Sequence, residues 1–234
     1  MVVLAKHPVA GAVKTRLARA VGPAAACALY RAFVRDLARR LARTGLVVWW
    51  AVTPAGAPLG RLVGSRRVFG QRGRDLGARI HHALRRVRAE GSGAAIALGA
   101  DAPHVPEREL RRAVRALARG VDVVLGPARD GGYYLIGVRT PVRALFADIP
   151  WSTPRVLAAT RRRCDALGLS RLELAPGFDV DEVADLVALR RVVRARPDEL
   201  PHTRRALAAV SRRLSRRVES PRPAASPSSG CGRR

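Results

Sequence analysis

The stretch AAIALGADAPHVPERELRRAVRAL, residues 94–117, contains the unit that decides the fold. Its first part, AAIALGAD, is a continuous run of small and branched apolar residues, which is typical of a strand buried on both faces of a sheet. Its second part, VPERELRRAVRAL, predicts a helix that opens at Pro106 with acidic residues in its first turn. The same alternation recurs along the chain and predicts a mostly parallel sheet with helices on both faces.

The other predicted elements surround this unit. Apolar runs predict further strands over residues 1–5, 46–53, 121–127 and 133–138, and we expect the first of these to lack several residues at its start. Helical spacing of apolar residues predicts helices over 22–43, 75–87 and 153–167, and an apolar helix follows the segment 177–186. In such a sheet ligands bind beyond the carboxyl ends of the strands, where the loops hold Lys6, Asp101 and Asp130.

Composition restricts the class of protein. The chain has 234 residues, of which 48% are hydrophobic and 26% charged, as in globular proteins. It has neither a run of ~18 apolar residues nor a secretory leader, so we expect a cytoplasmic protein without a membrane partner. Cys27, Cys164 and Cys231 are widely spaced, without a C-x-x-C pair, and are expected to be free thiols.

The formal charge of +26 favours anionic ligands. Only 4% of the residues are aromatic, and no RNP-like or zinc-finger pattern is present, so no specific nucleic-acid partner is expected. We predict one domain over residues 1–196 and a basic helical extension over 197–217, interpreted as a peripheral solvated helix. The Pro/Ser/Arg-rich segment 218–234 is expected to be disordered.

Both lysines of the chain lie in AKHPVAGAVKTRL, residues 5–17, and all other basic residues are arginines. The two lysines, Lys6 and Lys14, flank Pro8 and Gly11. Lysine is a compact, strongly hydrated point charge, whereas arginine is a planar fork. Their restriction to this loop suggests a phosphate site, although two lysines also fall close together by chance.

Acidic residues follow two predicted elements. Asp101 comes directly after the strand in LGADAP, where a carboxylate is placed to bind Mg²⁺ or Mn²⁺ together with substrate phosphates. It is equally placed to cap the next helix or close an Asx turn. In GFDVDEVADL, residues 177–186, Asp179 and Asp181 point to the same side if the chain is extended. One of them is then able to reach the metal, and Asp181 is the better candidate for the helix N-cap.

The stretch GPARDGGYYLIGV, residues 126–138, is the most specific local pattern. After Asp130, the glycines Gly131 and Gly132 allow the backbone to approach a ligand closely. Tyr133 and Tyr134 begin the next strand, and one of them is expected to face the ligand. An Asp-Gly hairpin turn explains the first part of the pattern equally well, but it does not require the paired tyrosines.

Two further loops contain candidate binding residues. IPWSTP, residues 149–154, places Trp151 in a loop, followed by Ser152 or Thr153 as the N-cap of a helix whose start is able to meet an anion. In QRGRDLGARI, residues 71–80, Gln71 is placed to contact a base or ribose. Asp75 is more simply a helix cap. No nucleophile elbow, dinucleotide fingerprint or Walker loop is present.

Taken in order, AKHPVAGAVKTRL, QRGRDLG, LGADAP, GPARDGGYYLIGV, IPWSTP and FDVDEVADL resemble a bacterial glycosyltransferase-like family that has long been labelled a domain of unknown function. Its members are associated with radical-SAM proteins and arsenosugar biosynthesis. The resemblance covers residues 1 to about 195. The family is similar to 2-phospholactate guanylyltransferase and to molybdenum-cofactor nucleotidyltransferases. This implies a single three-layer α/β/α domain of the GT-A, nucleotide-diphospho-sugar transferase type.

The resemblance also implies roles for residues. Lys14 and Arg16 match the basic loop that lies along the nucleotide phosphates, Asp101 the metal-binding aspartate, and Asp179 the second acidic position. We therefore expect a Mg²⁺- or Mn²⁺-dependent enzyme that transfers a sugar from a nucleoside-diphosphate sugar to a small-molecule acceptor. Lys14, Asp101 and Asp130 are its predicted catalytic residues, and Asp101, Asp179 and Asp181 its predicted metal ligands.

Two alternatives stay open at this point. One is a nucleotidyltransferase that uses a nucleoside triphosphate and releases pyrophosphate, which the basic loop favours because a triphosphate brings more negative charge. The other is a non-enzymatic nucleotide- or RNA-binding protein, which requires no metal and loses affinity steeply with salt. The base, the sugar, the acceptor and the oligomeric state are not indicated by the sequence.

Overall fold

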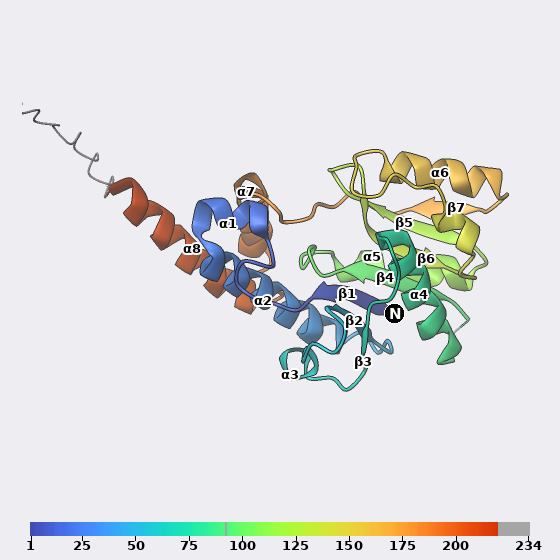
Figure 1. The fold of residues 1–234 in the computed structure, drawn as a ribbon, viewed down its shortest axis with the longest axis horizontal. Helices are drawn as coiled ribbons and strands as arrows, with labels where there is room; N and C mark the ends of the chain where they lie inside the picture. Colours follow the sequence, from blue (N-terminus) through green and yellow to red (C-terminus); the bar gives the residue numbers. More distant parts are fainter. Residues whose placement is uncertain (92, 220–234) are drawn as a thin grey trace, which may run out of the picture.

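The computed structural model describes residues 1–91 and 93–219 and has a three-layer α/β/α architecture around one mixed sheet (Figure 1). The strand order is β3-β2-β1-β4-β6-β5-β7. The strands are β1 (Val2–Lys6), β2 (Trp49–Thr53), β3 (Val68–Gly70), β4 (Ala95–Gly99), β5 (Val123–Pro127), β6 (Tyr133–Val138) and β7 (Arg171–Glu173). Only β6 runs antiparallel to its neighbours β4 and β5, which confirms the predicted mostly parallel sheet.

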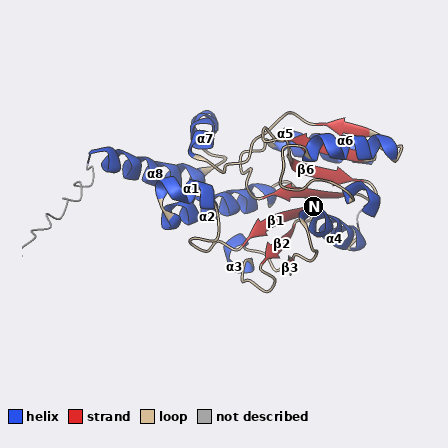
Figure 2. Cartoon of the chain, turned by 45° about the horizontal axis from the view of Figure 1, so that its top comes forward, coloured by secondary structure: helices blue, strands red, loops and turns tan. Residues whose placement is uncertain are grey.

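Helices cover both faces of this sheet (Figure 2). On one face lie α2 (Pro23–Leu41) and α5 (Glu107–Ala118). The short α1 (Thr15–Val21) and α3 (Gly60–Val63), together with α7 (Val183–Ala195) and α8 (Pro201–Glu219), join the same core, and α8 packs on α2 rather than on the sheet. The other face packs against α4 (Leu76–Ala89), the 3-10 turn η1 (Arg143–Phe146) and α6 (Val156–Ala166). Successive strand residues point to opposite faces, so Val2 and Val3 belong to different cores.

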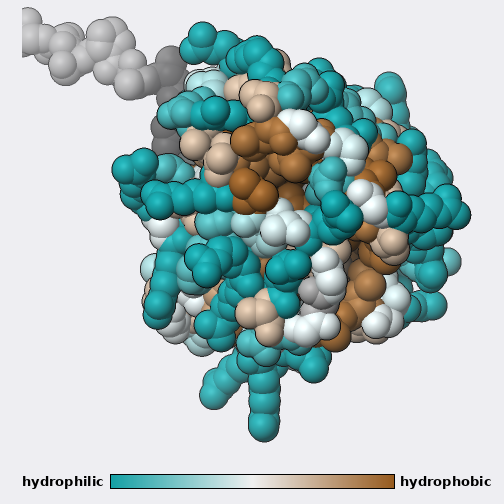
Figure 3. Space-filling view, turned by 90° about the vertical axis from the view of Figure 1, so that its right-hand side faces the viewer, coloured by the Kyte–Doolittle hydropathy of each residue, from teal (hydrophilic) through white to brown (hydrophobic). Residues whose placement is uncertain are grey.

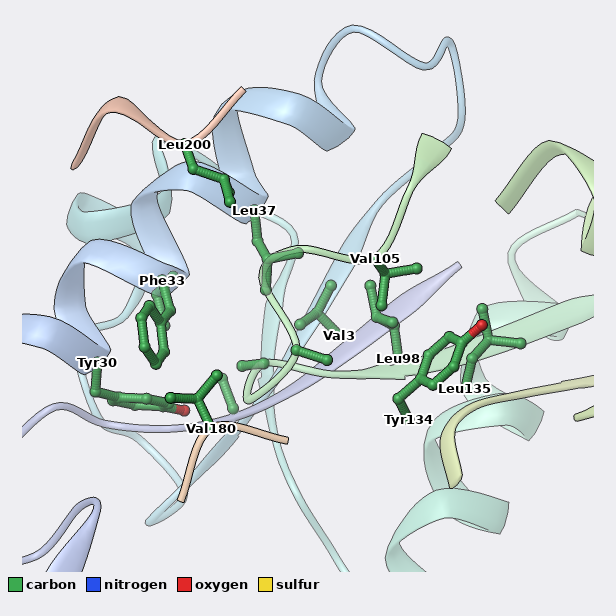
Figure 4. Close-up of a cluster of buried hydrophobic side chains, with 14 of the residues drawn as sticks. Val3, Tyr30, Phe33, Leu37, Leu98, Val105, Tyr134, Leu135, Val180 and Leu200 are labelled. Carbon is green, nitrogen blue, oxygen red and sulfur yellow. The ribbon is translucent and has the colours of Figure 1, made fainter. Parts of the chain in front are cut away.

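The larger core joins segments that are far apart in the sequence (Figure 4). Leu37 of α2 lies beside Val3 of β1, Phe33 lies near Tyr30 on the same helix, and Val180, from the loop before α7, is next to Tyr30 (Figure 4). Val180 is completely buried, which anchors the acidic residues on either side of it. The core therefore fixes the position of the loop that carries Asp179 and Asp181.

Helix α8 is tied to the body of the domain at its start. Asp36 of α2 is completely buried and accepts hydrogen bonds from the backbone N–H groups of His202 (3.1 Å) and Thr203 (2.7 Å). Leu207 and Val210 are buried against the same core. The first half of α8 is therefore part of the core, whereas the sequence suggested a solvated, peripheral helix. The helix extends to Glu219, and the remainder of the predicted tail, 220–234, lies outside the described residues.

Several short elements differ from the sequence predictions. The structure adds α1, α3, β3 and β7, which are too short for their periodicity to be recognised. Strand β1 pairs with β2 along its whole length, from Val2 opposite Trp49 to Lys6 opposite Thr53. Helix α2 begins at Pro23, as the helical spacing predicted.

The face seen from the right of Figure 1 is mostly hydrophilic, with separate apolar patches (Figure 3). Within the described part of the chain, no helix is long and apolar enough to cross a membrane. Cys27 and Cys164 are buried free thiols, as predicted, and Cys231 lies outside the described residues.

Candidate functional site

A cleft of about 480 Å³ opens at the carboxyl edge of the parallel strands. Its floor contains Lys6 at the end of β1, Thr53 at the end of β2 and Asp101 just beyond β4. Because β6 is antiparallel, its first residue, Tyr133, reaches the same edge. The cleft therefore lies where the sequence predicted a ligand site.

Most of the predicted site residues line this cleft. They come from six separate stretches of sequence and are Lys6, Arg16, Gln71, Asp101, Asp130, Gly132, Tyr133, Tyr134, Trp151, Ser152, Thr153, Asp179 and Asp181. Three predicted residues, Lys14, Asp75 and Gly131, do not line it. Lys14 is paired with Asp101 and Asp181, Asp75 caps α4, and Gly131 lies in the turn after Asp130.

Lys14 lies behind the cleft floor, with only 3% of its side chain exposed. Its ammonium forms ion pairs with Asp101 and with Asp181, the second at 3.0 Å. Burial lowers the pKa of Lys14, but the two carboxylates outweigh burial and leave the pKa above its usual value. The residue adopts a left-handed backbone conformation, φ 50°, at the N-cap of α1, which is uncommon for a residue other than glycine.

Asp179 is the least satisfied carboxylate of the site. Its Oδ1 atom is buried and has no hydrogen-bond partner within the described structure. Burial, together with the negative charges of Asp101, Asp130 and Asp181, raises the pKa of Asp179 to about 7, against the opposing influence of Lys14. The N–H of the next residue, Val180, donates to the carbonyl of Asp101 at 3.1 Å, which ties the two acidic segments together.

The loop after Asp179 contains a capping box, and its residues differ from the prediction. Glu182, not Asp181, is the N-cap of α7, and Asp185 is its reciprocal partner. The Asp185 carboxylate accepts from the N–H groups of Asp181 (2.9 Å) and Glu182 (2.8 Å). The prediction that Asp181 caps the helix is therefore wrong, because its side chain is taken up by the ion pair with Lys14.

The loop between β5 and β6 is a hairpin whose turn is fixed by Asp130 and the glycines. Asp130 Oδ1 accepts from the N–H of Gly132 at 2.9 Å, while the side chain lines the cleft. Gly131 has φ 84°, and a Cβ atom there would collide with the carbonyl of Pro154. The Gly131 carbonyl in turn accepts from the N–H of Leu157 at 2.8 Å. The hairpin interpretation is confirmed, and the same turn presents Asp130 to the cleft.

Aromatic residues form one wall of the cleft. Tyr133 and Trp151 meet edge to face, with ring centroids 6.3 Å apart. Tyr134 is turned into the core and donates its hydroxyl to the carbonyl of Ala175 at 3.0 Å. The absence of a side chain at Gly77 lets the Trp151 ring lie against α4. Tyr133 is therefore the tyrosine whose ring shapes the wall with Trp151.

The start of α6 differs from the prediction that Ser152 or Thr153 caps it. Arg155 is the N-cap, and no side chain caps the helix. Thr153 instead forms a turn, donating its hydroxyl to the carbonyl of Pro150 (2.7 Å) and accepting from the N–H of Arg155 (3.3 Å). Ser152 has φ 63° and closes the tight turn after Trp151.

Gln71, which lines the cleft, and Asp75, which does not, both form hydrogen bonds through their side chains. The Gln71 side-chain amide donates to the carbonyls of Ala5 (3.1 Å) and Ala51 (2.9 Å), so it holds the ends of β1 and β2. Asp75 is the N-cap of α4 and accepts from the N–H of Ala78 at 2.7 Å, which confirms its predicted capping role.

Sequence reasoning missed several lining residues, among them Tyr30, Leu76 and Arg79. Tyr30 lies on the buried face of α2, where its spacing is that of a core residue, and its hydroxyl accepts from the N–H of Lys6 at 2.9 Å. Arg79 is one of many arginines on predicted helices, and its Nε donates to the carbonyl of Gly73 at 3.2 Å. Neither residue has a sequence signal that separates it from its neighbours.

The carboxylates of the cleft floor meet part of the requirement of a divalent metal ion. Within residues 1–91 and 93–219, no three acidic, histidine or cysteine side chains are arranged to hold a metal ion by themselves. Mg²⁺ commonly uses one or two carboxylates and completes its shell with water and substrate phosphates. The unpartnered Oδ1 of Asp179, in a pocket of like charges, fits that smaller requirement.

Solved structures with the same fold include nucleotide-dependent enzymes, whereas no curated protein matches the chain. A "putative nucleotide-diphospho-sugar transferase" from Desulfovibrio desulfuricans G20 is 31% identical, with a TM-score of 0.81 over 91% of this chain and 96% of that one. Two others share the fold at lower identity. A cytidylyltransferase from Leptospira borgpetersenii serovar Hardjo-bovis is 12% identical, with a TM-score of 0.57 over 92% of this chain and 94% of that one. The CMP:2-keto-3-deoxy-manno-octonic acid synthetase complexed with CTP is 14% identical, with a TM-score of 0.52 over 83% and 97%.

The fold and the cleft thus agree with the predicted nucleotide-diphospho-sugar transferase architecture, and a family comparison places the chain more specifically. The model of one bacterial family matches residues 27–153, which is just over half of the sequence. The matched segment carries Gln71, Asp101, the Asp130 turn and Trp151. The chain belongs to the family described as "uncharacterized protein conserved in bacteria (DUF2064)".

Proposed function

We propose that this protein is a metal-dependent transferase that moves a sugar from a nucleoside-diphosphate sugar to a small-molecule acceptor. The proposal is supported by the 31% identity to the Desulfovibrio protein over nearly the whole chain and by the chemistry of the cleft. The broader statement, a transferase that uses a nucleotide substrate, also agrees with the fold shared with cytidylyltransferases.

The observation that carries the proposal is the unpartnered Asp179 carboxylate. A buried polar atom without a partner is unusual in a folded protein, because it loses its hydration without compensation. Here the carboxylate lies close to Asp101 and Asp130 in an open cleft, and their repulsion adds to the effect of burial. A cation bound between Asp101 and Asp179 would relieve both penalties.

The chain's own residues divide the work around the diphosphate. Asp101 and Asp179 would hold Mg²⁺ or Mn²⁺, which when bound supplies positive charge to the diphosphate leaving group. Lys6 and Arg16 line the same cleft and would neutralise the remaining phosphate charge. Arg16 is 68% exposed and only loosely paired with Glu182, at 3.7 Å, so it is available to an incoming anion.

Asp130 is placed to receive the acceptor's proton. One of its oxygens is fixed by the Gly132 N–H, which orients the carboxylate while it lines the cleft. In the proposed reaction the acceptor hydroxyl bonds to the anomeric carbon, the bond from that carbon to the diphosphate breaks, and the hydroxyl proton passes to Asp130. The Tyr133–Trp151 wall would exclude water from the sugar.

A second function, nucleotidyl transfer from a nucleoside triphosphate, is favoured by one observation. Lys6 and Arg16 place two cations beside the cleft, and a triphosphate offers them more negative charge than a diphosphate-sugar does. The same carboxylates would then neutralise the pyrophosphate that leaves.

A thermal-stability panel tests both functions. The protein is heated with nucleoside triphosphates or nucleoside-diphosphate sugars, each with Mn²⁺ or with EDTA. A ligand at 100 times its dissociation constant adds about 2.7 kcal/mol of stability, which raises the melting temperature measurably. We expect a shift with one diphosphate-sugar that disappears in EDTA. A shift with a triphosphate alone would favour nucleotidyl transfer, and a shift that survives EDTA would overturn the metal-dependent mechanism.

The variant Asp101→Asn completes this test. It is expected to abolish the Mn²⁺-dependent shift, because it replaces a charged metal ligand by a neutral amide of the same size. Asp198→Asn, at an exposed position that does not line the cleft, is the matched control and should retain the shift. A full shift in Asp101→Asn would remove Asp101 from the metal site.

A further inference from the structure

Lys14 has surroundings that a phosphate-binding lysine does not need. Its side chain is 3% exposed and does not line the cleft, whereas Lys6 in the same loop does. A ligand in the cleft therefore meets Lys6 directly but is separated from Lys14 by the carboxylates. The sequence suggested one phosphate site for both lysines, whereas in the structure Lys6 lines the cleft and Lys14 is buried behind it.

The ammonium of Lys14 occupies the position of a cation in the acidic floor. It is paired with two carboxylates from distant segments, Asp101 after β4 and Asp181 before α7. The Tyr30 ring lies 5.7 Å from the same ammonium and adds a cation–π contact. Asp179 and Asp130 contribute further negative charge nearby. Lys14 is the buried cation to which this group of acids is paired.

We propose that Lys14 is an internal counter-ion that positions Asp101 and Asp181 and competes with a divalent ion for Asp101. This inference rests on the proposed function, because it concerns the same metal ligands. The Lys14 ammonium pairs with Oδ1 of Asp101, so a divalent ion on the same carboxylate is repelled by Lys14 and shares the charge of Asp101 with it, which weakens metal binding. Lys14 thereby keeps metal affinity low in the free protein.

A consequence follows for substrate binding. When a diphosphate arrives with the metal, its negative charge offsets the repulsion between the metal and the Lys14 ammonium, so metal and nucleotide each strengthen the binding of the other. The left-handed backbone at Lys14 agrees with a functional role, because such strained conformations persist where the surroundings hold them and gather at binding sites. The carboxylates of Asp101 and Asp181 are 43% and 45% exposed, so they stay hydrated if Lys14 is replaced, and a variant at this position is expected to fold.

The first experiment uses the fact that the chain has two lysines. Protein labelled with ¹³C,¹⁵N-lysine should give two sets of side-chain signals, one for Lys14 and one for Lys6. On titration with Mg²⁺ alone, the signals of Lys14 should shift while those of Lys6 stay nearly constant. Unchanged Lys14 signals at Mg²⁺ concentrations that saturate binding, as measured by calorimetry, would overturn the inference.

The second experiment measures Mn²⁺ affinity without nucleotide, by electron paramagnetic resonance of the free ion. Lys14→Met should bind Mn²⁺ about tenfold more tightly than the natural protein, or more, because the competing charge is gone. Arg119→Met, at an exposed residue at the end of α5 that does not line the cleft, is the control for loss of a positive charge and should leave Mn²⁺ affinity unchanged. A merely structural role for Lys14 would lower stability without tightening metal binding.

The two proposals fail in different ways. If Lys14→Met binds Mn²⁺ no more tightly than the natural protein, the counter-ion inference is overturned, while a Mn²⁺-dependent shift with a nucleotide would still support the transferase. If no protein binds Mn²⁺ with or without nucleotide, both are overturned. If the gain in Lys14→Met is accompanied by a weaker dependence of Mn²⁺ affinity on nucleotide, the competition is supported directly.

Discussion

The seam between α2 and α8 contains a completely buried aspartate, Asp36, and the floor of the cleft contains Asp179, which has one buried oxygen; the two have opposite surroundings. Asp36 in the seam accepts two backbone hydrogen bonds at the start of α8. Asp179 in the floor has a buried oxygen without a partner, and its neighbours are mostly other carboxylates. The next residue along the chain, Leu37 in one case and Val180 in the other, belongs to the same core cluster.

This difference in surroundings indicates that Asp36 contributes to the stability of the fold, whereas Asp179 is kept for function. The charge of Asp36 is fully used by the fold, since the N–H groups at the start of a helix otherwise lack partners. The charge of Asp179 opposes folding and is expected to be useful only when a cation is bound. A carboxylate kept at a cost to stability marks a site where a ligand is missing from the protein alone.

The largest change in the free energy of unfolding is expected for Asp36, in the seam between α2 and α8. Asp36→Ala removes the acceptor of two buried N–H groups, and hydrogen bonds to charged groups contribute about 1.5–3 kcal/mol each, so the variant should lose about 3 kcal/mol or more. Urea unfolding followed by circular dichroism measures this loss. Asp198→Ala, at an exposed position near α8, is the control and should change little. A loss below about 1 kcal/mol would show that the Asp36 hydrogen bonds do not hold α8.

Substitution of Asp179 in the cleft is expected to raise the free energy of unfolding, whereas substitution of Asp36 lowers it. Asp179→Asn removes the unpartnered charge, so the free protein in EDTA at pH 8 should gain about 1–3 kcal/mol in unfolding free energy. The same variant should lose the Mn²⁺-dependent thermal shift with nucleotide. Destabilisation by Asp179→Asn would mean that the carboxylate has a structural partner and would remove the contrast with Asp36.

The pH dependence sharpens this prediction. The pKa of Asp179 is raised from 3.8 to about 7 in the folded protein. Below pH 4 the carboxyl is protonated in both states, so it has no differential effect. As the pH rises towards 7 the unfolded chain ionises first, which lowers the stability of the natural protein relative to Asp179→Asn. Unfolding in EDTA should therefore show the gain growing between about pH 4 and pH 7 and then levelling off. A gain independent of pH would contradict the raised pKa.

Much of the fold was predictable because its strands are continuous apolar runs. The unit 94–117 became β4, a loop with Asp101, and α5, because such runs are buried wherever the sheet places them. Helix α8 was misjudged because its basic residues indicate a solvated helix. The N–H groups at its start pair with an acidic residue in α2, more than 160 positions away, and such a pairing leaves no local pattern.

The sequence predicted most of the residues that line the site, but not which of them contact one another. Asp101 was found because it stands at the end of an apolar run, the Asp130 turn because of its glycines, and Trp151 because it lies in a loop before a predicted helix. The burial of Lys14 was not, since the sequence does not show which lysine of the loop faces Asp181. The cap of α7 also shifted by one residue, because Asp181, Glu182 and Asp185 are all able to cap and the choice depends on the distant Lys14.

The smallest change in the free energy of unfolding is expected for Asp185 in the cap of α7. This aspartate is hydrogen-bonded like Asp36 but more exposed to water. Asp185 accepts from two N–H groups, as Asp36 does, but one of the two donors, Glu182, is exposed, and water can replace the lost bond there. Asp185→Ala should therefore cost about 1 kcal/mol in urea unfolding, within the usual range for helix caps. Asp185→Asn retains an acceptor and should recover most of the loss. The Mn²⁺-dependent shift should weaken slightly in Asp185→Ala, because the N–H of Asp181 is no longer held. A loss as large as that of Asp36→Ala would mean that hydrogen bonds rather than burial decide how strongly an aspartate supports this fold.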